Sequence, residues 1–141
     1  MAHAHYPLGR SERQLQDRVQ AMLDDGELVR AAVVAFTGPR AGVEGLLAPL
    51  LGVLSRSLNV GRRFTTIAVT TQGVVLLDTK RPRRPVRVHN RLATLDALGP
   101  INDTDGDSWI QVDGTKYWVE GTWSAQLYVM RQLKRSSSPT P

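Results

Sequence analysis

The chain has 141 residues, of which 41% are hydrophobic and 22% charged, a size at which one domain can bury its own core. It contains no cysteine, which excludes disulfides, thiolate metal ligands and thiol nucleophiles. Its formal net charge of +5 favours an anionic partner, whether nucleic acid, acidic lipid or acidic protein. The sequence opens without the pattern of a signal peptide and has no apolar run of about 18 residues, so we expect a soluble, cytoplasmic protein.

The first ten residues, 1–10, lack periodicity and are expected to form a flexible tail. A helix is predicted to begin at Ser11, because Ser11 and Gln14 fit a capping box. Gly26 is placed to end this helix in a left-handed conformation. The apolar face of the helix would carry Leu15, Val19, Met22 and Leu23.

Seven later segments have the alternation or β-branched composition of strands. They are residues 27–36, 64–70, 74–79, 86–89, 92–98, 109–112 and 116–120, the segment 92–98 being the weakest. Short glycine-bearing connections at 71–73 and 113–115 predict two β-hairpins. The alternation at 86–89 indicates an edge strand with one solvated face.

A closing helix is predicted over residues 122–134, with Thr122 as its N-cap. Residues 136–141 are expected to fray into solvent, so the domain would span residues 11–135. The inward face of this helix would carry Trp123, Leu127, Met130 and Leu133.

An apolar stripe with the i, i+3, i+4, i+7 spacing of a helix lies between the first two predicted strands. It predicts a helical insert over residues 43–58 in the first hairpin, which Pro49 would kink. An apolar stripe with basic flanks suits an anionic membrane surface or an apolar partner, and equally burial against the domain's own sheet or a second copy. The candidate apolar contact residues are Leu46, Leu47, Leu50, Leu51, Leu54 and Leu58.

A basic cluster follows the second predicted hairpin strand, and two prolines stiffen it. Its side chains could hold phosphate groups through charge and bidentate guanidinium contacts. They could equally be solvated charges that keep an edge strand from aggregating. With Arg62 and Arg63 beside the insert, the candidate anion-binding residues are Lys80, Arg81, Arg83, Arg84, Arg87 and Arg91.

The sequence offers little to catalysis. No serine lies in a nucleophile motif, and no glycine-rich phosphate loop follows a strand. His89 lies on an alternating strand and is expected to be exposed. Three tryptophans, Trp109, Trp118 and Trp123, are expected to fill the core, although an exposed set beside cations would instead stack on single-stranded nucleic acid. We therefore expect no enzyme activity, no metal and no cofactor.

Three segments carry a resemblance to a known family: residues 31–39 (AAVVAFTGP), 65–78 (TTIAVTTQGVVLLD) and 121–130 (GTWSAQLYVM). Together they resemble the pleckstrin-homology-like (PH-like) superfold, in particular the small bacterial PH-like and GRAM-like domains, over about residues 24–135. The resemblance implies an α+β, mainly β fold. Its core would be a curved antiparallel sheet or partly open barrel of about seven strands, capped by a C-terminal helix. The N-terminal helix and the insert would be additions.

The resemblance implies a non-enzymatic adaptor that binds lipid headgroups, peptides or proteins. Phosphoinositide-binding members carry Lys and Arg residues in the first hairpin, where this chain has leucines, so no phosphoinositide pocket is transferred. Two hypotheses remain. One is a PH-like module that docks its apolar insert on a partner protein, on itself as an oligomer, or peripherally on an anionic membrane; the other is a nucleic-acid-binding protein that uses residues 80–91.

Overall fold

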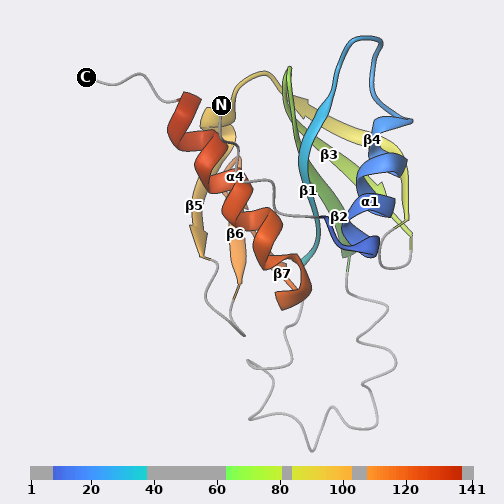
Figure 1. The fold of residues 1–141 in the computed structure, drawn as a ribbon. Helices are drawn as coiled ribbons and strands as arrows, with labels where there is room; N and C mark the ends of the chain where they lie inside the picture. The colour runs from blue at the N-terminus through green and yellow to red at the C-terminus, as the bar shows by residue number, and fades with distance from the viewer. Residues whose placement is uncertain (1–7, 38–62, 81–83, 103–107, 138–141) are drawn as a thin grey trace, which may run out of the picture.

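The computed structural model describes residues 8–37, 63–80, 84–102 and 108–137. All of the strands in these ranges form one antiparallel sheet in the order β4-β3-β2-β1-β7-β6-β5, which is not closed, since β4 and β5 are its two edges (Figure 1). This confirms the predicted mainly β class and the number of strands. The strands are β1 Val29–Thr37, β2 Arg63–Thr70, β3 Gly73–Thr79, β4 Pro85–Leu92, β5 Leu98–Asn102, β6 Trp109–Val112 and β7 Thr115–Val119.

Both predicted hairpins are confirmed, and glycine conformation explains their turns. Between β2 and β3, Gly73 has a φ of 134°, and a Cβ at this position would lie 2.2 Å from the carbonyl oxygen of Leu92. Between β6 and β7, Asp113 and Gly114 have φ values of 50° and 82°. Two successive left-handed residues make the type of tight turn that matches the twist of paired strands.

Strand β1 lies in the middle of the sheet. It pairs with β2 over nearly its whole length and with β7 only at Ala35 and Phe36. Two helices pack against it: α1 (Arg10–Gln20), which also reaches β4, and α4 (Ser124–Ser137), which also reaches β5 (Figure 1). Each helix thus connects β1 to one edge of the sheet. The sheet and its two helices form a single packed unit.

Along the part of β1 that does not pair with β7, glutamine side chains from the two helices accept hydrogen bonds from the backbone of β1. The N–H of Ala32 donates to Oε1 of Gln126 at 3.1 Å, and the N–H of Val29 donates to Oε1 of Gln20 at 2.9 Å. Gln126 is 2% exposed, and it also accepts from Gln16 of α1 at 2.8 Å. A buried N–H left without an acceptor would destabilise the fold, so Gln126 explains how α4 can cover this edge of β1.

The core fills the space between the sheet and the helices. Strand β2 is buried at every position from Thr65 to Thr70, so both of its faces are covered. The predicted inward face of the closing helix is confirmed: Trp123, Leu127 and Met130 are at most 2% exposed, and Leu133 packs against them half-buried. From α1, Leu15 and Val19 join the same cluster.

The predicted helix ends were wrong. Helix α1 begins after Gly9, whose N–H donates to the carboxylate of Glu12 at 3.2 Å, so Ser11 lies inside the helix. The helix ends at Gln20, and Gly26, with a φ of 81°, serves instead the turn that leads into β1. Thr122 does not cap α4, because it lies within a 3₁₀ turn, η3 (Gly121–Trp123), that precedes the helix.

The predicted weak strand at 92–98 was also wrong. Residues 95–97 form a 3₁₀ turn, η2 (Leu95–Ala97), and the strand β5 begins at Leu98. Leu92, Leu95 and Leu98 are three residues apart, which matches the repeat of a 3₁₀ turn better than the alternation of a strand.

The insert leaves from the hairpin that the sequence predicted. Strands β1 and β2 stay in register up to the pair Thr37 and Arg63, so the intervening segment 38–62 connects two paired strands. The predicted helical insert at 43–58 lies outside the described residues. The six candidate leucines lie there too: Leu46, Leu47, Leu50, Leu51, Leu54 and Leu58.

Candidate functional site

The two basic groups that the sequence suggested separately meet at one end of the sheet. Arg63 begins β2, and the next residue, Phe64, pairs with Thr79 at the end of β3. The β3–β4 turn follows at once and is closed by a hydrogen bond of 3.0 Å from the N–H of Lys80 to the carbonyl of Arg84. We call this end, formed by Thr37, Arg63, Lys80 and Arg84, the insert base.

The cations of the insert base are exposed. Within the described ranges, the side chains of Arg63, Lys80 and Arg84 form no ion pair. Arg63 is close enough to Asp78 to help lower the pKa of that carboxyl, although a hydrogen bond from Arg87 has the largest effect. Three solvated cations therefore surround the point at which the chain enters and leaves the insert.

Two other members of the predicted cluster hold carboxylates of the chain itself. Nε of Arg87 donates to Asp78 at 2.6 Å, on an exposed surface that also places Nδ1 of His89 3.5 Å from Asp78. Arg91 donates from one nitrogen to both oxygens of Glu27, at 2.9 and 3.1 Å. His89 is exposed, as expected. The predicted members Arg62, Arg81 and Arg83 lie outside the described residues.

Glu27 is a buried carboxylate that joins three parts of the chain. Its side chain is 0% exposed and accepts hydrogen bonds from the hydroxyl of Thr70 at 2.6 Å and from the N–H of Asp24 at 3.2 Å, in addition to Arg91. Burial alone would raise the pKa of Glu27, but the hydrogen bonds from Thr70, Arg91 and Asp24 together lower it. The sequence had suggested Arg91 as a ligand for external phosphate, whereas this geometry gives it a role in stability.

A row of aromatic side chains crosses the sheet beside the insert base. Trp109 of β6 pairs with Trp118 of β7, Trp118 pairs with Phe36 of β1, and Phe36 pairs with Phe64 of β2. All four are half-buried, and the rings of the two phenylalanines meet edge to face at 6.4 Å. We call these four residues the aromatic row.

Sequence reasoning missed the aromatic row, because it assigned all three tryptophans to the core. Only Trp123 is fully buried. Trp109 and Trp118 alternate with the buried Ile110 and Val119, so they lie on the opposite face of their strands. Lys116 places its ammonium group 4.3 Å from the ring centre of Trp109 and 4.5 Å from that of Trp118. The alternation in β6 and β7 was the signal that could have found this arrangement.

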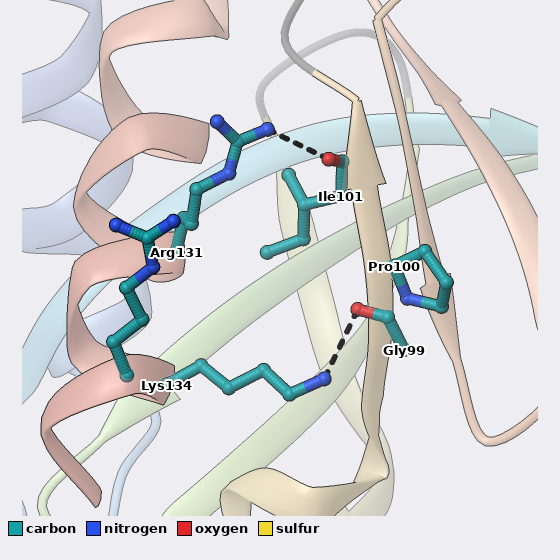
Figure 2. Close-up of a pocket in the computed structure, with 6 residues that line it drawn as sticks. Gly99, Pro100, Ile101, Arg131 and Lys134 are labelled. Atoms are coloured by element: carbon teal, nitrogen blue, oxygen red, sulfur yellow. Dashed lines mark hydrogen bonds between the residues drawn. The ribbon is translucent and has the colours of Figure 1, made fainter. Parts of the chain in front are cut away.

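A hollow of about 280 Å³ lies between β5 and α4 (Figure 2). Its lining residues are Gly99, Pro100, Ile101, Arg131, Lys134 and Arg135. Arg131 donates to the carbonyl of Ile101 at 2.7 Å, and Lys134 donates to the carbonyls of Leu98 and Gly99. Because β5 is an edge strand, its carbonyl oxygens could pair with a strand of another chain. Arg131 and Lys134 occupy these oxygens with hydrogen bonds from their side chains. The cations that line the hollow therefore have a structural role at the edge of the sheet.

Gly99 allows this arrangement through its size. A Cβ on Gly99 would lie 2.9 Å from the Cβ of Gln111 on the neighbouring strand. The pairing of β5 with β6 shifts register between Leu98 and Ile101, as expected where the chain bulges at Gly99 and Pro100.

The described residues contain no cluster of histidine and acidic side chains that could hold a metal ion. In the same ranges, neither α1 nor α4 has the length and apolar character needed to cross a bilayer. No protein family model, no curated protein and no solved structure matches this chain.

Proposed function

We propose that this protein is a non-enzymatic, PH-like interaction module that docks through its apolar insert and the basic residues beside it. The three surfaces it could engage are a partner protein, a second copy of itself and an anionic membrane. An open seven-stranded antiparallel sheet with a C-terminal helix is the architecture that the PH-like resemblance implies, and it supports this assignment. A fold of this kind serves many ligands, so the argument for function comes from the site.

The observation that carries the proposal is the convergence of charge at the insert base. The register of β1, β2 and β3 brings Arg63, Lys80 and Arg84 to the end of the sheet from which the leucine-bearing segment leaves. An apolar segment with cations at its base is suited to a surface that has an apolar interior and an anionic rim. Arg63 begins β2, and Lys80 and Arg84 lie in the turn between β3 and β4.

The nucleic-acid alternative is less well supported. It relied on the cluster at 80–91, but within the described residues Arg87 and Arg91 hold Asp78 and Glu27. Each such ion pair reduces the positive charge that a phosphate backbone would meet, and affinity for nucleic acid depends on that charge.

The proposal is tested by replacing Leu47, Leu50 and Leu54 together with serine in the full chain. We expect the fold to persist, since a hairpin loop can lose apolar area without breaking the strand pairs. Association with partner, self or vesicles should be lost, because each leucine withdrawn from water contributes about 1.5 to 3 kcal/mol. Sedimentation measures self-association, and flotation with anionic vesicles measures membrane binding.

The matched control is Leu28→Ser, which removes an exposed leucine (59% exposed) just before β1, at the end of that strand away from the insert base. It should bind as the wild type does. A triple variant that unfolds would place those leucines in the domain core. A folded triple variant with unchanged mass and unchanged vesicle binding would remove the insert as the docking surface.

A further inference from the structure

The aromatic row and Lys116 form a chemical combination that the insert alone does not explain. Indole rings have a large apolar body and one polar N–H, and they favour the boundary between the headgroups and the acyl chains of a bilayer. Lys116 holds its ammonium group over both rings, where it offers a cation to a lipid phosphate beside the apolar surface of the indoles. Trp109, Trp118 and Lys116 provide both functions within one hairpin.

The aromatic row is continuous with the insert base. Its last pair, Phe36 and Phe64, is followed directly by the pair Thr37 and Arg63, at which the insert begins and ends. Beyond Phe64 the next strand ends at Thr79, followed by Lys80. The row therefore starts at β6, crosses β7 and β1, and ends at β2 beside the insert base. Arg63 and Lys80 alternate with Phe64 and Thr79, so they lie at the same end of the sheet but on its opposite face.

We infer that the aromatic row is a membrane-contact surface that lies in the headgroup layer of an anionic bilayer. This inference rests on the proposed function and narrows it to one partner. The charge of the region fits that partner, because Lys116 lies on the face of the row, and Arg63, Lys80 and Arg84 are exposed cations at the same end of the sheet. Each cation near an anionic leaflet strengthens attraction to it.

The three tryptophans provide a direct test. One variant, Trp123→Phe, keeps the two tryptophans of the row; another, Trp109→Phe with Trp118→Phe, keeps only Trp123, which is 2% exposed inside the core. Both are mixed with vesicles of phosphatidylglycerol and phosphatidylcholine whose acyl chains carry bromine near the headgroup or near the bilayer centre. Circular dichroism establishes that each variant is folded, and flotation establishes whether it is bound.

We expect the emission of Trp109 and Trp118 to shift to shorter wavelength on binding and to be quenched most by bromine near the headgroup. Trp123 should be quenched by neither lipid, because it stays inside the domain. Replacing Trp109 and Trp118 with alanine should weaken vesicle binding about tenfold or more, since each ring contributes apolar contact area at the interface. Lys116→Gln should weaken binding less, and only at low salt.

The outcomes separate the two proposals. Flotation that depends on the leucines but leaves Trp109 and Trp118 unquenched would overturn the aromatic row as a contact surface and keep the insert as the docking element. Leucine-dependent self-association or partner binding without flotation would also overturn it, and would assign the insert to protein. Loss of every leucine-dependent association would remove the proposed function itself.

Discussion

The two ends of β1 differ in whether the polar and charged groups around them are bonded within the fold or exposed. At its start, Gln20 and Gln126 bond its backbone, and Glu27 holds Arg91 in a buried pair, so polar groups are used within the fold. At its other end, the insert base presents cations that form no ion pair within the described residues. The helix-covered end therefore contributes to stability, whereas the insert base is the end that we propose for binding. Substitutions should separate the two properties.

The largest loss of stability is expected in the core beneath α4. Replacing Leu127 or Met130, both 0% exposed, with alanine should lower the free energy of unfolding by about 2 to 5 kcal/mol, because each change leaves a cavity. Chemical denaturation followed by circular dichroism measures the loss. Arg135→Ala, at an exposed position of the same helix, is the control and should change little. Midpoints like that of the wild type for both core variants would show that α4 is not part of the core.

A smaller loss is expected at the buried ion pair. Arg91→Met leaves Glu27 buried without its cation and should cost about 3 kcal/mol, the lower end of the range for buried pairs, because Arg91 is itself 36% exposed. Arg87→Met removes the partner of Asp78 on the surface, where Arg87 is 76% exposed, and should cost less than about 1 kcal/mol. The same denaturation experiment compares them. Equal costs would contradict the distinction between a structural and a surface arginine.

Glu27 should also make stability depend on pH. Its pKa in the folded protein is lowered from the ordinary value of 4.5, so its contribution is fully present above that pH and is lost as the pH falls through the folded value. The difference in unfolding free energy between wild type and Glu27→Gln should therefore shrink between about pH 5 and pH 3. Denaturant titrations across this range measure it. A difference that stays constant with pH would mean that Glu27 is not the ionised partner of Arg91.

The sequence was sufficient for local structure that depends on nearest neighbours. The Gly73 and Gly114 turns and the inward face of α4 follow from spacing of a few residues, and the structure confirms them. The edge position of β4 is also confirmed, but its alternation is not, because Val86 is 44% exposed. Helix ends were less predictable, because a backbone N–H can be bonded by more than one nearby side chain. At the start of α1 the N–H of the N-cap residue Gly9 donates to the carboxylate of Glu12, so Ser11 does not serve as the N-cap.

What the sequence could not provide was the pairing of distant residues. Glu27 and Arg91 are 64 residues apart, and only the fold brings them together. The same is true of Phe36 and Trp118 in the aromatic row and of Arg63 and Lys80 at the insert base. From the sequence alone, Arg91 and Lys80 were therefore placed in the same basic cluster. In the fold, Arg91 holds the buried carboxylate of Glu27, whereas Lys80 faces solvent.

The smallest effect on stability, and the sharpest test of the comparison, is expected at the insert base. Replacing Arg63, Lys80 and Arg84 with glutamine should change the unfolding free energy by less than about 0.5 kcal/mol, because these side chains are exposed. Binding to anionic vesicles should fall about 100-fold at low salt, since each cation near the surface contributes about 1 kcal/mol. The effect should diminish as salt screens the charges.

The control for this variant removes the same charge elsewhere. Replacing Arg13, Arg30 and Arg135 with glutamine lowers the formal net charge from +5 by three, as the first variant does, but these residues lie on α1, the start of β1 and α4. If attraction depended only on net charge, both variants would lose affinity equally. A loss confined to the first variant would place the anionic surface at the insert base, whereas equal losses would leave it without a special role.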